Sequence, residues 1–328
     1  MPRAFRLVRR RLLSAIPVLL IVLVGTFFLL EAAPGDAVDA YLVGTGGDAA
    51  MIETLRARWG LDASPLARLG AFLLAVGQGD LGWSVSLSRP VLDVVLERLP
   101  NTLLLMGSAV ALSFALGSLL GVAAGSRPGS WRDRLLSFGS LALYAMPSFW
   151  LGLVLAVVFA VNLRWFPLSG VETIASGKTG LARVGDIAWH LALPVLSLGL
   201  IYLALYLRMM RTGMAEAWRQ DFVLAARARG LSRPRIVWRH VARNALLPLV
   251  TMLGLQAASM LGGSVVIESV FSVPGLGRLA AEAVASRDTP LLLGIILASA
   301  VTVILVNLLV DCAYAALDPR VGANEAGR

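Results

Sequence analysis

Six long apolar stretches, separated by polar segments rich in arginine, dominate the pattern of this chain. Each lacks Asp, Glu, Lys and Arg and is about as long as the 20 or so residues that a membrane-crossing helix needs. Because lipid offers the backbone no water, and because the stretches do not alternate as barrel strands do, helices are predicted. The stretches cover residues 12–30, 99–126, 135–163, 187–207, 244–267 and 289–310.

Composition supports a membrane protein, since 58% of the 328 residues are hydrophobic and only 15% are charged. A soluble domain could not solvate such a surface. The first stretch follows several arginines, as in a signal peptide, and Ala32-Ala33 offers a possible cleavage site. Because its apolar core is longer than that of a typical signal peptide, we expect an uncleaved first span. The chain is thus predicted to be one transmembrane domain, residues 1–328.

The distribution of basic residues predicts the orientation. If the amino terminus lies inside, 19 of the 29 basic residues fall in the inside segments 1–11, 127–134, 208–243 and 311–328. This bias agrees with the positive-inside rule, so both termini and the segment 208–243 are predicted to be cytoplasmic. The long segment 31–98 is then external, and the net charge of +9 indicates topology rather than binding of nucleic acid.

Two short helices joined by a turn are predicted within the cytoplasmic segment. Gly230 suits a left-handed turn, and Pro234 suits the first turn of a helix. Apolar periodicity gives each helix one face. These faces comprise Phe222, Ala225, Ala226 and Arg229 in the first helix and Ile236, Val237, His240 and Val241 in the second. Charge alone would indicate only an ordinary basic loop.

The spacing of Ala225-Ala226 and Gly230 resembles the "EAA" loop of permease subunits in ATP-driven importers. Leu224 replaces the usual glutamate, and the closing pair Leu247-Pro248 comes late. Both departures resemble the dipeptide/oligopeptide/nickel permease branch. In that branch close counterparts exist for Asp221, Ala226, Arg227, Gly230, His240, Arg243, Asn244 and Pro248.

Three further stretches carry the same resemblance. Residues 30–36 resemble "L-x-x-A-P-G-D", residues 79–91 resemble "G-D-L-G-x-S … x-P-V", and residues 268–277 resemble "E-x-V-F-x-x-P-G-L-G". The resemblance implies an all-α integral membrane protein of the type I ABC importer permease kind, with six transmembrane helices. It also implies a second homologous permease, ATP-binding cassette ATPase subunits and an extracytoplasmic solute-binding protein as partners. ATP would be used by those ATPase subunits, with no cofactor on this chain, in a bacterial or archaeal cytoplasmic membrane.

The resemblance assigns contact with the ATPase to one set of residues. They are Asp221, Phe222, Ala225, Ala226, Arg227, Gly230, Arg239 and His240. Pro147-Ser148 and Gly262-Gly263 are candidates for the translocation path, although a plain kink and close helix packing are the simpler explanations. Short external helices are expected at 52–59 and 67–76, either as a structural cap or as a contact for the binding protein. Small residues around Gly117, Gly121 and Gly125 predict a close helix approach.

Catalytic chemistry is not expected. His190 and His240 lie far apart in the topology, and Cys312 is the single cysteine, so neither a metal site nor a catalytic pair is predicted. Ser176–Thr179 resembles the end of a phosphate-binding loop, but Glu172 occupies the position that such a loop reserves for glycine. The spans lack the ionisable residues of ion-coupled carriers, which favours an external energy source. A secondary transporter or channel working without an ATPase remains the alternative, and the solute is left open among peptides, nickel chelates and other small molecules.

Overall fold

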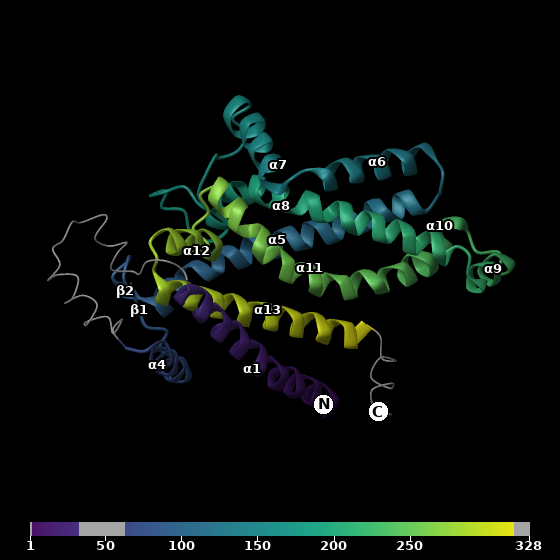
Figure 1. Ribbon diagram of the computed structural model, residues 1–328. Coiled ribbons are helices and arrows are strands. Elements are labelled where there is room, and N and C mark those ends of the chain that lie inside the picture. Colours follow the sequence, from purple (N-terminus) through teal and green to yellow (C-terminus); the bar gives the residue numbers. More distant parts are fainter. Residues whose placement is uncertain (1, 33–62, 318–328) are drawn as a thin grey trace. The chain divides into compact units, whose positions relative to one another are not determined.

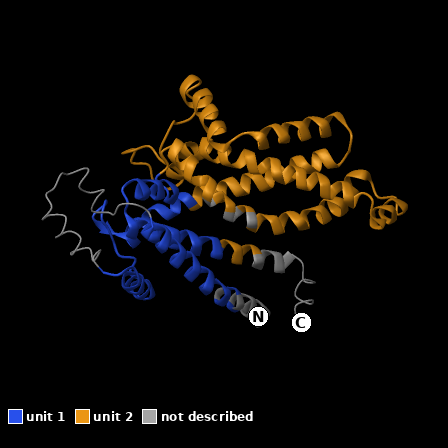
Figure 2. Cartoon of the chain, viewed as in Figure 1, with its two compact units in different colours: residues 1–102, 274–305 blue, residues 103–273, 306–328 orange. Residues whose placement is uncertain are grey.

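The computed structural model describes residues 2–32 and 63–317, which are almost entirely helical apart from one short β-hairpin (Figure 1). The chain forms two compact units (Figure 2). Unit 1 comprises residues 1–102 and 274–305, and unit 2 comprises residues 103–273 and 306–328. Helices α5 and α13 each contribute residues to both units.

Unit 1 is built from helices at the two ends of the sequence. Its elements are α1 (Pro2–Glu31), α4 (Pro65–Gly77), β1 (Trp83–Ser84), β2 (Arg89–Pro90), the start of α5 (Val91–Gly125), α12 (Leu276–Ala285) and most of α13 (Thr289–Leu317). Buried apolar residues of α5, α12 and α13, such as Val91, Leu279 and Leu291, share one core. Helix α4 confirms the predicted helix at 67–76, with Ser64 capping it by accepting a hydrogen bond from the Ala67 amide. The helix expected at 52–59 lies outside the described residues.

Asp288 holds the hairpin of unit 1 to the start of α13. Its side chain is buried and accepts hydrogen bonds from Ser84 Oγ at 2.7 Å, Ser86 N at 2.9 Å and Ser86 Oγ at 2.8 Å. Its other oxygen accepts from the Leu291 amide at 3.1 Å, which is a helix cap. One carboxylate therefore fixes two segments that are 202–204 residues apart in sequence, a role that the sequence pattern did not reveal.

Unit 2 is a helical bundle around α8. Its elements are α6 (Trp131–Ala145), α7 (Ser148–Leu155), the π-helical turn η1 (Ala156–Asn162), α8 (Gly180–Ala217), α9 (Asp221–Ala228), α10 (Arg233–Ile236), the π-helical turn η2 (Val237–Val241) and α11 (Ala242–Val270), with the ends of α5 and α13. Helix α8 packs against α6, α7 and α11. Its most apolar window is 67% buried, against 28% in α5, so α8 is the core helix of the bundle.

The glycines of α5 let this helix approach α8 closely, as the small-residue pattern predicted. Cβ atoms added to Gly117, Gly121 and Gly125 would lie 2.7, 2.5 and 2.8 Å from the Cβ atoms of Tyr206, Met210 and Met214, respectively. Contacts this short leave no room for a side chain. The stripe at every fourth residue of α5 therefore sets the distance between the two helices.

The third apolar stretch differs from the expectation of one kinked helix. The helices α6 and α7–η1 meet at a bend of 103° around Met146 and Pro147. Both residues have extended backbones, with ψ angles of 136° and 140°. A proline disfavours helical geometry in the residue before it and donates no amide hydrogen bond, so the helix breaks here rather than bending.

Several helices extend beyond the apolar stretches. Helix α8 continues past Leu207 to Ala217, and α5 begins at Val91, ahead of residue 99. By length and composition, the described residues contain four helices able to cross a membrane, or five if α6 and α7–η1 form one broken span. Helix α11 additionally covers the whole apolar stretch 244–267.

Candidate functional site

A helix-turn-helix formed by α9 and α10 occupies the arginine-rich segment, and its turn centres on Gly230. The Gly230 backbone is left-handed, with φ of +73°. Its amide donates to Arg227 O at 2.9 Å, and the Leu231 amide donates to Ala226 O at 3.2 Å. These two bonds are those of a Schellman motif, in which a left-handed residue ends the helix. Pro234 lies in the first turn of α10, as predicted.

The helix-turn-helix is built into the core of unit 2. Val223 and Ala226 of α9 are 2% and 4% exposed, and they join a cluster that includes Met210 and Met214 of α8. Ile236, Val237, Val241 and Ala245 from α10, η2 and α11 belong to the same cluster. A displacement of α9 would therefore be transmitted directly to α8 and α11, because a close-packed core resists deformation.

The four residues that the sequence pattern placed on one face of α9 do not share one environment in the structure. Ala226 and, in part, Phe222 pack inward, so in this chain they support the motif. Ala225 is exposed, and Leu224 is 70% exposed although it is strongly apolar. Sequence periodicity missed both the buried Val223 and the exposed Leu224, because the helix is only eight residues long and gives each face barely two positions.

Trp218 fastens the turn to the end of α5. Its indole Nε1 donates to Gly125 O at 2.9 Å, and the guanidinium carbons of Arg227 and Arg233 lie 5.6 and 5.9 Å from the ring centroid. Arg233 also donates to Ser126 O at 3.0 Å. These cation–π and hydrogen-bond contacts give two of the arginines a structural role within the chain.

A buried ion pair ties α8 to the turn at residues 127–134. Arg211 Nη2 donates to Asp133 Oδ2 at 2.9 Å, and the Gly129 amide donates to the same oxygen at 2.8 Å. Asp133 precedes the apolar stretch 135–163 and is 2% exposed. The hydrogen bond from Arg211 lowers the pKa of Asp133 to about 2, with the Gly129 amide contributing in the same direction. The carboxylate is therefore ionised at any physiological pH.

A second cluster lies at the opposite end of α8. Lys178 Nζ donates to the buried Asp186 carboxylate at 2.6 Å, and Thr173 donates to it through N and Oγ1 at 2.7 and 2.9 Å. The bond from Lys178, followed by the Thr173 amide, holds the pKa of Asp186 well below its ordinary value. Because Lys178 is engaged by this carboxylate, residues 176–179 form a folded loop and not a phosphate cradle.

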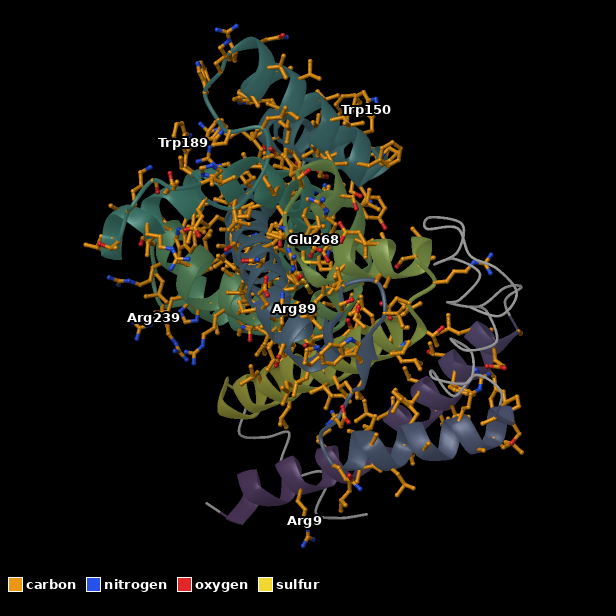
Figure 3. The ribbon with its side chains drawn as sticks, turned by 90° about the vertical axis from the view of Figure 1, so that its left-hand side faces the viewer. Arg9, Arg89, Trp150, Trp189, Arg239 and Glu268 are labelled. Atoms are coloured by element: carbon orange, nitrogen blue, oxygen red, sulfur yellow. The ribbon has the colours of Figure 1, made fainter. Side chains whose placement is uncertain are left out.

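The remaining predicted site residues occupy separate places. Pro147 and Ser148 form the break between α6 and α7, whereas Gly263 faces Leu198 and Tyr202 of α8 and Gly262 faces open space. The atoms nearest to the two glycines therefore belong to neither Pro147 nor Ser148. Arg239 projects outward from η2, and Glu268 is buried near the end of α11 (Figure 3). His240 is half-buried on η2, and its carbonyl accepts from Asn244.

Metal or cofactor binding finds no support in these side chains. Within residues 2–32 and 63–317, no three His, Cys, Asp or Glu side chains gather as a metal site would require. Most of the residues predicted to contact the ATPase lie instead on the helix-turn-helix of α9 and α10.

The long apolar helices of the described residues, four or five of which are able to cross a membrane, define a multi-pass α-helical membrane protein. Family models match most of the chain: residues 117–323 match the binding-protein-dependent transport system inner membrane component, and residues 4–106 match the N-terminal part of such membrane components. The chain belongs to this family of transport-system permeases and is a multi-pass inner membrane protein.

Curated relatives match over nearly their full length. The chain is 37% identical to the oligopeptide transport system permease protein AppB of Bacillus subtilis, over 95% of this chain and 98% of AppB. It is 36% identical to the glutathione transport system permease protein GsiC of Pectobacterium atrosepticum, over 95% and 97% of the two chains. The inward-facing MetNI methionine ABC transporter has a chain of similar fold, with a TM-score of 0.51 and 19% identity, over 69% of this chain and 97% of that one. The chain is thus the membrane subunit of an ABC importer of the peptide-permease type.

Proposed function

We propose that this chain forms, together with a second permease, the translocation path for peptides or a similar small solute delivered by an external binding protein. ATP hydrolysis takes place on separate ATPase subunits, and this chain has no catalytic site of its own. The names of the relatives support peptides as the solute class, since one is an oligopeptide permease and another a glutathione permease. Family membership disfavours the alternative of a carrier or channel that works without an ATPase.

The proposed topology has six spans with both termini in the cytoplasm. Helices α1, α5, α8, α11 and α13 cover five of the apolar stretches, and the bent pair α6 and α7–η1 covers the remaining one. In this arrangement α9 and α10 face the cytoplasm, where ATP is. The arginine bias supports this orientation, because cytoplasmic loops of membrane proteins are enriched in Arg and Lys.

The single observation that carries the mechanism is the continuity between the helix-turn-helix and the core of unit 2. Val223 and Ala226 are packed with the α8 methionines, while Leu224 and Ala225 on the other side of α9 stay exposed. An ATPase that binds the exposed side of α9 and displaces this helix also displaces α8 and α11. Alternating access then follows as a rigid-body movement of these helices.

Asp221, Arg227, Gly230, Arg239 and His240 complete the proposed coupling surface around α9 and η2. Asp221 lies in the first turn of α9, where the helix dipole stabilises a negatively charged side chain. The break at Pro147-Ser148 and the open face at Gly262 are the proposed moving parts of the path, because a broken helix and a glycine face both permit displacement. Gly263, in contact with α8, would follow its movement.

Two substitutions at Gly230 test the coupling role. Gly230→Pro is incompatible with φ of +73°, whereas Gly230→Asn tolerates the left-handed conformation and has open space around the new side chain. We expect Gly230→Pro to abolish solute uptake while the chain still inserts, and to leave ATP hydrolysis uncoupled from uptake. Gly230→Asn should keep uptake within about threefold of the original, since the cost of a left-handed asparagine is modest. Normal uptake by the proline variant would refute the coupling role.

A further inference from the structure

A groove on the side of unit 2 has a lining that combines an apolar wall with two cationic side chains. It encloses about 440 Å³ and lies between α5, α8, η2 and α11. Its apolar wall includes Leu119, Val122, Met210 and Leu246, while Trp238, Arg239 and Arg243 complete the lining. No acidic residue contributes to the lining, so both guanidinium groups lack a counter-charge within the groove.

Ser118 adds an independent sign that the groove holds a ligand. The residue is 9% exposed and lines the groove, and its Oγ has no hydrogen-bond partner in the structure. A buried hydroxyl without a partner costs about 1–3 kcal/mol, so native structures leave few of them. A hydrogen-bonding group that enters the groove would satisfy this hydroxyl.

The position of the groove along the helices places it across a membrane boundary. Arg243 immediately precedes the apolar stretch 244–267, and Trp238 and Arg239 lie one helical turn before it. Ser118 and Val122 lie inside the stretch 99–126, about 6–12 Å from its end at 1.5 Å per residue. The charged groups are therefore at headgroup level and the apolar wall at acyl-chain level. Tryptophan and arginine are the side chains that favour such an interface.

We propose that this groove binds one anionic phospholipid of the membrane leaflet on the arginine-rich side. Its phosphate pairs with Arg239 and Arg243, its glycerol-ester region reaches Ser118, and an acyl chain covers the apolar wall. Arginine suits this role because its planar guanidinium makes two parallel hydrogen bonds to a phosphate. A free phosphate ion would leave the apolar wall unfilled, and an apolar helix of another subunit would leave both guanidinium groups and the hydroxyl without partners.

Such a lipid would lie beside the junction between η2 and α11, where the helix-turn-helix joins the bundle. It would fill the space between α5 and α11 at the point through which movement of α9 reaches the bundle. The proposal therefore adds a dependence on anionic lipid that the coupling role of Gly230 does not require.

Trp238 provides the probe for the test, since it lines the groove and is 57% exposed. The full chain, purified as its membrane complex, is reconstituted in phosphatidylcholine vesicles that contain increasing fractions of either brominated phosphatidylglycerol or brominated phosphatidylcholine. Subtracting the signal of a Trp238→Phe variant isolates the fluorescence of this residue. We expect brominated phosphatidylglycerol to quench Trp238 at a concentration about fivefold lower per arginine, the advantage of one Lys or Arg near an anionic surface.

The double variant Arg239→Gln/Arg243→Gln should remove the preference for the anionic lipid. Arg235→Gln is the matched control, because Arg235 is exposed on α10 and does not line the groove. It removes one positive charge from the same segment and should leave the preference unchanged. The proposal is overturned if both lipids quench equally, or if Arg235→Gln alone also abolishes the preference. It is likewise overturned if neither lipid quenches Trp238. A crosslink from a cysteine placed at Leu119 in a Cys312→Ser background to another subunit would then identify protein as the occupant of the groove.

Discussion

Gly121 of α5 and Met210 of α8 approach so closely that a Cβ atom added to the glycine would lie 2.5 Å from the methionine Cβ. The added atom would also lie 2.8 Å from the Leu207 carbonyl oxygen, which belongs to the backbone and cannot rotate away. The same helix carries Gly107, around which a Cβ atom would meet nothing within 4 Å. A side chain at position 121 is therefore excluded by α8, whereas position 107 of the same helix has room for one.

Gly121→Ala is expected to destabilise the chain by about 1–3 kcal/mol, the usual cost of overpacking a close contact. Gly107→Ala, the control on the same helix, should change stability by no more than about 1 kcal/mol and in the favourable direction, since alanine is the better helix former. Thermal unfolding of the two variants in the same detergent measures the difference. Equal melting temperatures would contradict the close packing of α5 on α8.

The ion pair between Asp133 and Arg211 should make stability depend on pH. Because the pKa of Asp133 is lowered in the folded chain from 3.8 to about 2, its contribution is fully present above about pH 4 and is lost as the pH falls toward 2. We therefore expect the original chain to exceed Asp133→Asn in stability at pH 6, by about 1–3 kcal/mol given that Arg211 is partly exposed. The gap should close near pH 2 to 3. A gap that stays constant between pH 6 and 2.5 would show that the carboxylate charge is unimportant.

Asp288→Asn is expected to loosen the hairpin of unit 1. Both oxygens of Asp288 accept from a backbone amide, one from Ser86 and the other from Leu291. Asparagine has only one oxygen, so its NH2 group would face one of these two donors. Hydrogen exchange at residues 83–90 should accelerate by about tenfold or more, corresponding to a loss of more than 1 kcal/mol.

Asp80→Asn is the matched control for the hairpin. Asp80 Oδ1 accepts from the Gly82 amide at 2.8 Å in a turn that asparagine forms equally well. Exchange at residues 83–90 should remain unchanged in this variant. Equal acceleration in both variants would mean that the hairpin is not held by Asp288.

Lys178 offers a test of the proposed orientation, because it is the single lysine of the sequence. Its side chain is 39% exposed, so an amine-reactive reagent can reach it. We expect a membrane-impermeant reagent to label it from outside in cells freed of their outer layers. Lys178→Arg, which keeps a cation beside Asp186, should remove this label completely, because the proposed topology places the terminal amine in the cytoplasm, beyond the reach of the reagent. Labelling of Lys178 solely in inside-out vesicles would reverse the proposed topology.

Much of the fold was predictable because membrane insertion is governed by local composition. The apolar stretches gave the long helices, and the family motifs gave the permease class, which the relatives confirm. The turn at Gly230 and the helix at 67–76 were predictable for the same reason, since glycine, proline and capping residues act within a few positions.

Other features depended on contacts between distant segments. The pattern predicted a kink at Pro147, but the chain bends by 103°, and no local rule fixes the direction of the helix after such a break. The sequence did not reveal that Val223 is buried and Leu224 exposed, because α9 packs against α8 through a face that only the tertiary structure selects. The sequence also named Arg227 as a candidate contact for the ATPase without revealing that Arg227 and Arg233 lie over the Trp218 ring.

The sequence by itself determined that this is a helical membrane protein of the peptide-permease family with a glycine-centred turn in its basic segment. Hydrophobic transfer and backbone preferences act residue by residue, so a linear pattern records them. The tertiary structure alone decided which carboxylates are paired, which face of α9 remains free, and that an apolar groove near Ser118 is bordered by two arginines. Those properties arise when side chains far apart in the chain remove one another from water. The free energy of this burial depends on distances between side chains that sequence order does not encode.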